Sequence, residues 1–157
     1  MKYFVAGALV LTAVLVLAGC GGSTLPSFDE VRDETHVEMQ KIVDRLPEGA
    51  VVRMDDPMPD FSYPCDGGVG IFYTGEWGVY VADGFGIQPW MDEVKVDLLA
   101  DGYFEVAADA SITRSFSLRA PKTDILLGVS NDQDAEQGAR ILVRGYSRCA
   151  QDPEPRK

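Results

Sequence analysis

The chain has few of the residues that enzymes most often use for catalysis or metal binding. Its 157 residues include one histidine, His36, and three cysteines. A single imidazole excludes sites built from several histidines. No G-x-S-x-G segment supplies a hydrolase nucleophile, and no glycine-rich segment ends in the G-K-[ST] of a phosphate-binding loop. We therefore predict no catalytic residue, and we interpret His36 as an exposed residue on a charged helix.

Basic residues are also scarce. The chain has 14 Lys and Arg against 25 Asp and Glu, for a formal net charge of −11. Phosphate backbones are bound by concentrated basic side chains, so we expect no nucleic-acid partner. A polybasic membrane-surface role is disfavoured for the same reason. The acidity instead favours a soluble domain that an anionic envelope repels.

The first twenty residues have the organisation of a secretory signal. Met1-Lys2 is basic, and residues 3–17 are almost wholly apolar and uncharged. This run is shorter than the roughly 20 residues that a membrane-spanning helix needs. Leu17-Ala18-Gly19-Cys20 resembles the bacterial lipobox. The resemblance implies that residues 1–19 are removed and that Cys20 carries a diacylglycerol. The alternative is an ordinary signal peptide or signal anchor with an incidental cysteine.

Lipidation would place the mature chain outside the cytoplasm, anchored to the bacterial cell membrane. Two acyl chains give stable anchoring, whereas a single chain is marginal. If Cys20 carries lipid, only Cys65 and Cys149 remain, and an oxidising compartment permits a disulfide between them. The alternative is two free thiols. The bond would close a loop of 84 residues.

Hydrophobic spacing divides the rest of the chain. We expect a flexible tether over residues 20–27, a single domain over 28–149 and a disordered tail over 150–157. Apolar residues at three- and four-residue steps predict helices over 28–46 and 89–100. Alternating or short apolar runs predict strands over 50–54, 69–81, 103–108, 112–120, 124–130 and 139–148. We expect a bend or bulge at Gly75 and polar loops over 55–64 and 131–138.

In outline, the predicted order is α-β-β-α-β-β-β: two strands precede the second helix and a run of strands follows it. Runs of strands joined by hairpin-length links are typical of antiparallel sheets. We therefore predict an α+β fold, a two-layer sandwich in which two helices cover one face of a largely antiparallel sheet.

Four short segments together resemble the small actinobacterial lipoproteins of the LppA/LppV type. They are Thr24-Leu25 before the first helix, Cys65-Asp66-Gly67, the strand around Trp77, and Ser147-Arg148-Cys149. The resemblance implies a lipid-anchored envelope domain with a cysteine staple. It implies no reaction and no catalytic residue.

Aromatic residues supply the candidate binding positions. On the long strand, Phe72 and Tyr80 lie on the opposite side from Trp77, so we expect them to form an exposed patch for a partner. Trp77 and Phe85 are expected mainly in the core, or lining a cleft between helices and sheet. We therefore expect a non-catalytic module that binds an envelope protein or the cell wall. The alternatives are a carrier or sensor of a small hydrophobic ligand such as a lipid, and, with less support, an enzyme built on converging carboxylates.

Acidic loops are the remaining candidate sites, and we predict no metal in them. Asp132, Asp134 and Glu136 have the alternate spacing of a calcium loop, but the glycine comes one position late and Val143 replaces the last ligand. A second group of acids is interpreted as solvated: Asp55, Asp56, Asp60 and Asp66. We expect no cofactor besides the diacylglycerol on Cys20.

Overall fold

The computed structural model describes residues 25–59, 61–107, 114–134 and 138–153. The predicted signal peptide, Cys20 and most of the tether therefore lie outside the described residues. The elements follow in the order α1 (Phe28–Val43), β1 (Val51–Asp55), β2 (Phe61–Pro64), β3 (Ile71–Val81), α2 (Ile87–Ala100), β4 (Phe104–Val106), β5 (Ser115–Arg119), β6 (Leu126–Asp134) and β7 (Gly138–Ala150).

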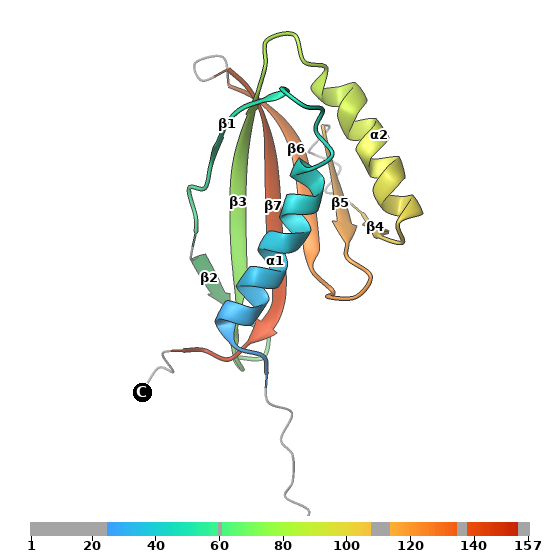
Figure 1. Ribbon diagram of the computed structural model, residues 1–157. Helices are drawn as coiled ribbons and strands as arrows, with labels where there is room; N and C mark the ends of the chain where they lie inside the picture. Colours follow the sequence, from blue (N-terminus) through green and yellow to red (C-terminus); the bar gives the residue numbers. More distant parts are fainter. Residues whose placement is uncertain (1–24, 60, 108–113, 135–137, 154–157) are drawn as a thin grey trace, which may run out of the picture.

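All the strands belong to one antiparallel sheet. Its order is β1-β3-β7-β6-β5-β4, and β2 pairs with β3 below β1 on the same edge. Both helices lie on one face of this sheet (Figure 1). The α+β class, the antiparallel sheet and the placement of the helices are thus confirmed. The short strand β2 lies in a stretch that we predicted as loop.

Local signals account for α1. The Glu30 amide donates to the Ser27 hydroxyl at the N-cap (3.2 Å), and Val31, Thr35, Met39 and Ile42 are fully buried, as their spacing predicts. The helix ends at Val43 rather than 46. Its last three predicted residues form a tighter turn, in which the Arg45 and Leu46 amides bond three residues back.

Helix α2 begins at Ile87 and ends where expected. Pro89 lies in its first turn, where its missing N–H costs no bond. Gly102 follows the helix with a φ of +92°, and the Tyr103 amide closes the end by donating to the Leu98 carbonyl (3.1 Å). The helix buries Trp90, Met91, Val94 and Leu98, which follow the three- and four-residue steps that predicted it.

Strand β3 is one continuous strand, and Tyr73, Trp77, Val79 and Val81 point toward the helices as the alternation predicts. The irregularity is not at Gly75. The register between β3 and β7 shifts between Phe72 and Thr74, where two residues of β7 face one of β3. There the Tyr73 amide donates to the Ser147 hydroxyl (2.9 Å).

Two other predicted boundaries are wrong. Residues 131–134 and Gly138, which we predicted as loop, belong to strands, because β6 and β7 stay paired up to Asp134 and Gly138. Asp132 supports this extension through an ion pair with Arg140 across the two strands (2.6 Å). The tail does not begin at 150, since Ala150 ends β7 and is fully buried. Residues 154–157 lie outside the described residues.

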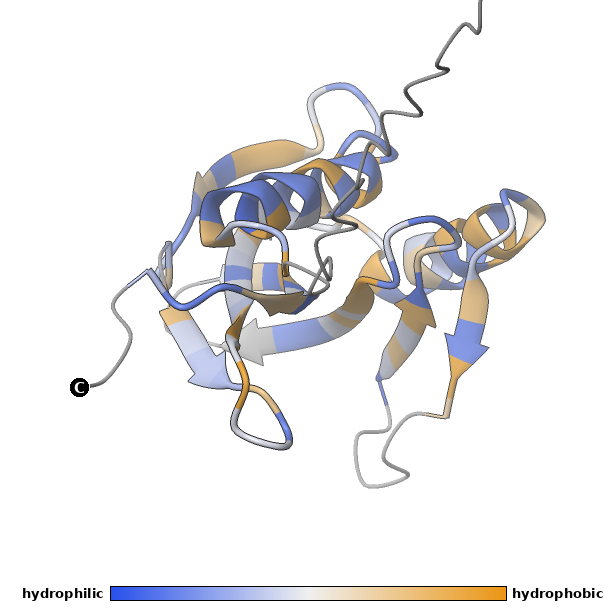
Figure 2. Cartoon of the chain, turned by 90° about the horizontal axis from the view of Figure 1, so that it is seen from below, coloured by the Kyte–Doolittle hydropathy of each residue, from blue (hydrophilic) through white to orange (hydrophobic). Residues whose placement is uncertain are grey.

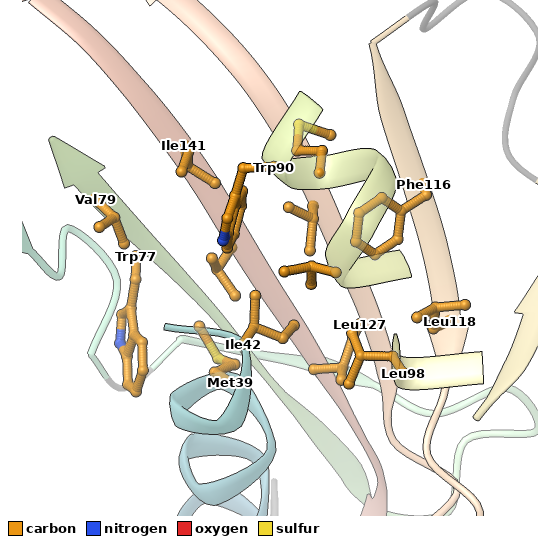
Figure 3. Packing of buried hydrophobic residues seen from close by; sticks show 14 of the residues in the cluster. Met39, Ile42, Trp77, Val79, Trp90, Leu98, Phe116, Leu118, Leu127 and Ile141 are labelled. Atoms are coloured by element: carbon orange, nitrogen blue, oxygen red, sulfur yellow. The ribbon is translucent and has the colours of Figure 1, made fainter. Parts of the chain in front are cut away.

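Side chains from both helices meet the sheet in one hydrophobic core (Figure 3). Each helix carries hydrophilic as well as hydrophobic residues, as elements that bury one side do (Figure 2). Helix α1 approaches β7 closely at Gly145. A Cβ there would lie 2.4 Å from Cγ2 of Thr35 and 2.8 Å from Sδ of Met39. The absence of a side chain at this position therefore sets the distance between helix and sheet.

Candidate functional site

The structure does not bring the four predicted binding residues together. Trp77 and Tyr80 are buried, with 7% and 5% of their surface exposed. Phe85 follows β3 and packs against Trp90, with ring centroids 6.4 Å apart. Phe72 is half-buried on the side of the sheet away from the helices. Of the predicted patch, only Phe72 lies near exposed aromatic neighbours.

Tyr80 was predicted to be exposed, and this prediction is wrong. The Arg53 guanidinium lies over its ring, 3.7 Å from the centroid. Arg140 approaches from the next strand and donates to the Tyr80 hydroxyl (3.3 Å). Long arginine side chains cover apolar surface while their charged ends stay in water. Neighbouring strands, not the helices, therefore bury this ring.

His36 is not an exposed surface residue either. It is half-buried between α1 and the sheet, and its Nε2 lies 2.7 Å from the Tyr73 hydroxyl. Its ring centroid is 5.4 Å from that of Trp77. Tyr73 itself is fully buried. The single imidazole thus joins α1 to β3 as a packing and hydrogen-bonding residue.

The sheet side away from the helices, here called the open face, bears mostly paired charges in its central strands. Arg144 of β7 donates to Glu76 of β3 (2.5 Å). The Arg140 guanidinium donates a hydrogen bond to Asp132. This hydrogen bond, and after it in size the one to Tyr80, raises the pKa of Arg140. Such a ladder satisfies its own charges. The middle of the open face therefore offers little unpaired charge to a ligand.

One end of the open face is aromatic. Phe61 and Tyr63 of β2 have ring centroids 5.2 Å apart, and Tyr63 lies 5.8 Å from Phe72. The two β2 rings are 45% and 49% exposed. We call these three residues the aromatic row. Sequence reasoning missed two of them because nearby prolines indicated a loop, although Phe61 and Tyr63 alternate as strand residues do.

A disulfide braces the aromatic row. Cys65 follows β2 and is bonded to Cys149 of β7, with 6.1 Å between their Cα atoms. Cys149 is also the register partner of Phe72. The Cys65 amide donates to the Gly70 carbonyl (3.1 Å), which closes the turn between β2 and β3. The predicted cysteine pair is present, and it ties the edge strand to the centre of the sheet.

The arrangement closest to catalytic chemistry is a buried carboxylate. Glu38 is 6% exposed and lies in a surface recess of about 280 Å³. The Tyr103 hydroxyl donates to one of its oxygens (2.5 Å) and the Lys41 ammonium to the other (2.8 Å). Burial and then this hydrogen bond raise the pKa of Tyr103. Both oxygens of the carboxylate in this recess therefore have a hydrogen-bond partner.

The acidic segments give no metal site in the part of the chain that the structure describes. No group of three or more His, Cys, Asp or Glu side chains converges there. Asp132 is engaged by Arg140. The candidate ligands Glu136 and Asp60 lie outside the described residues.

Among residues 25–59, 61–107, 114–134 and 138–153, neither helix is long and apolar enough to span a bilayer. Comparison of the chain with protein-family models, with curated proteins and with solved structures finds no match in any of the three.

Proposed function

We propose that the chain is a lipid-anchored lipoprotein of the bacterial cell envelope that binds a partner protein and catalyses no reaction. The lipobox-like Leu17-Ala18-Gly19-Cys20 supports the anchor. The disulfide between Cys65 and Cys149 supports an oxidising compartment outside the cytoplasm. The resemblance to LppA/LppV-type lipoproteins is part of the same proposal.

The aromatic row carries the binding part of the proposal. Phe61 and Tyr63 keep about half of their surface exposed although a disulfide holds their strand in place. Aromatic side chains bring large contact area at low entropic cost and dominate many protein interfaces. A rigid support further lowers the cost of binding. The row is therefore suited to a preformed contact with another protein.

The carrier hypothesis has less support. A site for a lipid-sized ligand is a cavity or cleft of several hundred Å³. The space between the helices and the sheet is instead filled by 19 buried hydrophobic residues, which include Met39, Trp90 and Leu127 (Figure 3). No described feature of the core favours an internal ligand.

The anchor is tested by palmitate labelling and membrane fractionation of cells that express the chain. The wild-type protein should incorporate label and sediment with membranes, because diacylated proteins dissociate slowly. Cys20→Ala should lose the label and leave the membrane fraction. A Cys20→Ala protein that stays with the membranes would contradict the proposal.

Partner binding is tested with a photo-crosslinking amino acid at Tyr63 in intact cells. The control position is Phe104, which is 61% exposed on β4 at the other edge of the sheet. We expect a discrete crosslinked species from position 63 only. In the reciprocal experiment, the partner protein identified in this way should crosslink to this chain when the partner carries the probe. Identical products from both positions, or none from position 63, would refute a contact at the aromatic row.

A further inference from the structure

Helix α1 begins and β7 ends at the same end of the molecule (Figure 1). Leu25, Pro64, Val69 and Ile71 line a surface recess of about 610 Å³ there, together with Gly68, Gly70, Gln151 and Asp152. We call this surface the tether end. It is separate from the aromatic row, whose rings lie on the open face.

The tether end holds the first described residues firmly. The Gln151 amide donates to the Pro26 carbonyl (2.8 Å), and its side chain donates to the Leu25 carbonyl (2.6 Å). Leu25 also packs against Gly70: a Cβ added at Gly70 would lie 2.8 Å from Cδ1 of Leu25. The point at which the chain joins the domain is therefore defined by the fold.

Chain length then limits how far this end can lie from the anchor. Five residue steps separate Cys20 from Leu25, a span of at most about 17 Å when fully extended. Strand β3, with 11 residues, is about 36 Å long. The tether is thus shorter than the domain, and a lipid on Cys20 holds the tether end near the headgroups.

The tether end exposes apolar side chains, which are more favourably placed among lipid headgroups than in water. Val69 is 71% exposed at the tip of the turn, and Pro64 beside it is also exposed. Apolar side chains that enter the interfacial region leave water and contribute favourably. The charged neighbours Asp66 and Asp152 are acidic, so any such contact is apolar and favours zwitterionic over anionic lipid.

We infer that the tether end rests on the lipid surface, so that the domain stands end-on and presents its open face sideways to a partner. This inference rests on the proposed anchor at Cys20. The contact adds to the covalent anchor and sets orientation, with Val69 as its main apolar residue. Gly84 lies between β3 and α2, at the end of β3 opposite to the tether end, and in this orientation it is held away from the membrane.

The test uses the mature chain, residues 20–157, coupled through Cys20 to a maleimide lipid in phosphatidylcholine nanodiscs that contain a gadolinium-chelating lipid. Chemical coupling supplies the anchor, so this result is independent of whether cells lipidate Cys20. We expect loss of the amide NMR signals of Gly68 and Val69, with the signal of Gly84 retained.

Two variants make the test specific. Val69→Asp should weaken the signal loss at Gly68 while the protein stays coupled. Val96→Asp, at a 65% exposed position on α2, should leave the wild-type pattern unchanged. Equal signal loss at Gly68 and Gly84 would overturn the end-on orientation. So would loss at Tyr63 with Gly68 retained. Unchanged loss in Val69→Asp would overturn the apolar contact.

Discussion

At the scale of single residues, environment changes the chemical role of a side chain. Glu38 lies on α1, whose exposed side carries many acids, yet it is nearly buried and held by Tyr103 and Lys41. A buried carboxylate is costly unless it is paired and hydrogen-bonded. Here both conditions are met, by Lys41 on α1 and by Tyr103 between α2 and β4. The interaction therefore contributes to stability.

Tyr103→Phe should lower the free energy of unfolding at pH 7 by about 2 kcal/mol, because Glu38 loses a hydrogen bond to a charged group. Urea denaturation measures this change. Tyr103→Phe should also alter the alkaline pH dependence. The usual tyrosine pKa is 10.0, whereas burial and the bond to Glu38 raise the pKa of Tyr103 in the fold.

The sign of the pH effect follows from which state loses its proton first. Below pH 10 both the folded and the unfolded chain keep the Tyr103 proton. Above it the unfolded chain ionises first, so this tyrosine's contribution to stability is lost as the pH rises. Wild-type stability should therefore fall more steeply than that of Tyr103→Phe as the pH rises above 10. Parallel curves would show that Tyr103 is not the titrating group.

At the scale of elements, contact between α1 and the sheet depends on small residues in the strands. Gly75 and Gly145 are register partners on β3 and β7. A Cβ at Gly75 would lie 2.3 Å from the Tyr73 hydroxyl, and Gly145 lies beneath Thr35 and Met39. Glycine normally weakens a strand, but it permits close approach of another element. These two glycines make room for Tyr73 and α1.

Gly145→Ala should lower the free energy of unfolding by about 1–3 kcal/mol, because overpacking forces α1 away from β7. Gly128→Ala is the matched control, since its Cβ would meet only the Cβ of Arg144 at 3.7 Å, an ordinary contact. Denaturant unfolding of both variants gives the comparison. Equal stabilities would mean that α1 adjusts without cost.

At the scale of the whole molecule, one covalent link joins the middle of the chain to its last strand. The disulfide joins the residue after β2 to β7, and β7 ends beside the start of α1. The aromatic row and the tether end adjoin this link on either side. A chain with a formal net charge of −11 thus combines an acidic surface with two small apolar ones.

Removal of the disulfide should destabilise the domain strongly. The chain-entropy relation for a loop of 84 residues gives a loss of about 4.5 kcal/mol. Urea unfolding of the double variant Cys65→Ser with Cys149→Ser, compared with wild type, measures this loss. Under reducing conditions, the free energy of unfolding of wild type should approach that of the variant. A variant as stable as the oxidised wild type would show that packing alone holds β2 in place.

The sequence by itself determined much of the local structure. Spacing identified both helices, the long strand β3 and the α+β class. The cysteine pair followed from the expectation that Cys20 carries lipid. These features depend on interactions within a few residues or on simple pairing. They also depend on the period of each element, which the chain carries locally.

Only the tertiary structure decided which side chains stay exposed. Periodicity states the side of a strand on which Tyr80 lies, but not that Arg53 from another strand would cover it. It cannot show that His36 would meet Tyr73, or that β2 would pair with β3 and place Phe61 and Tyr63 in a row. Exposure depends on neighbours that are distant in sequence, and those neighbours exist only once the sheet has formed.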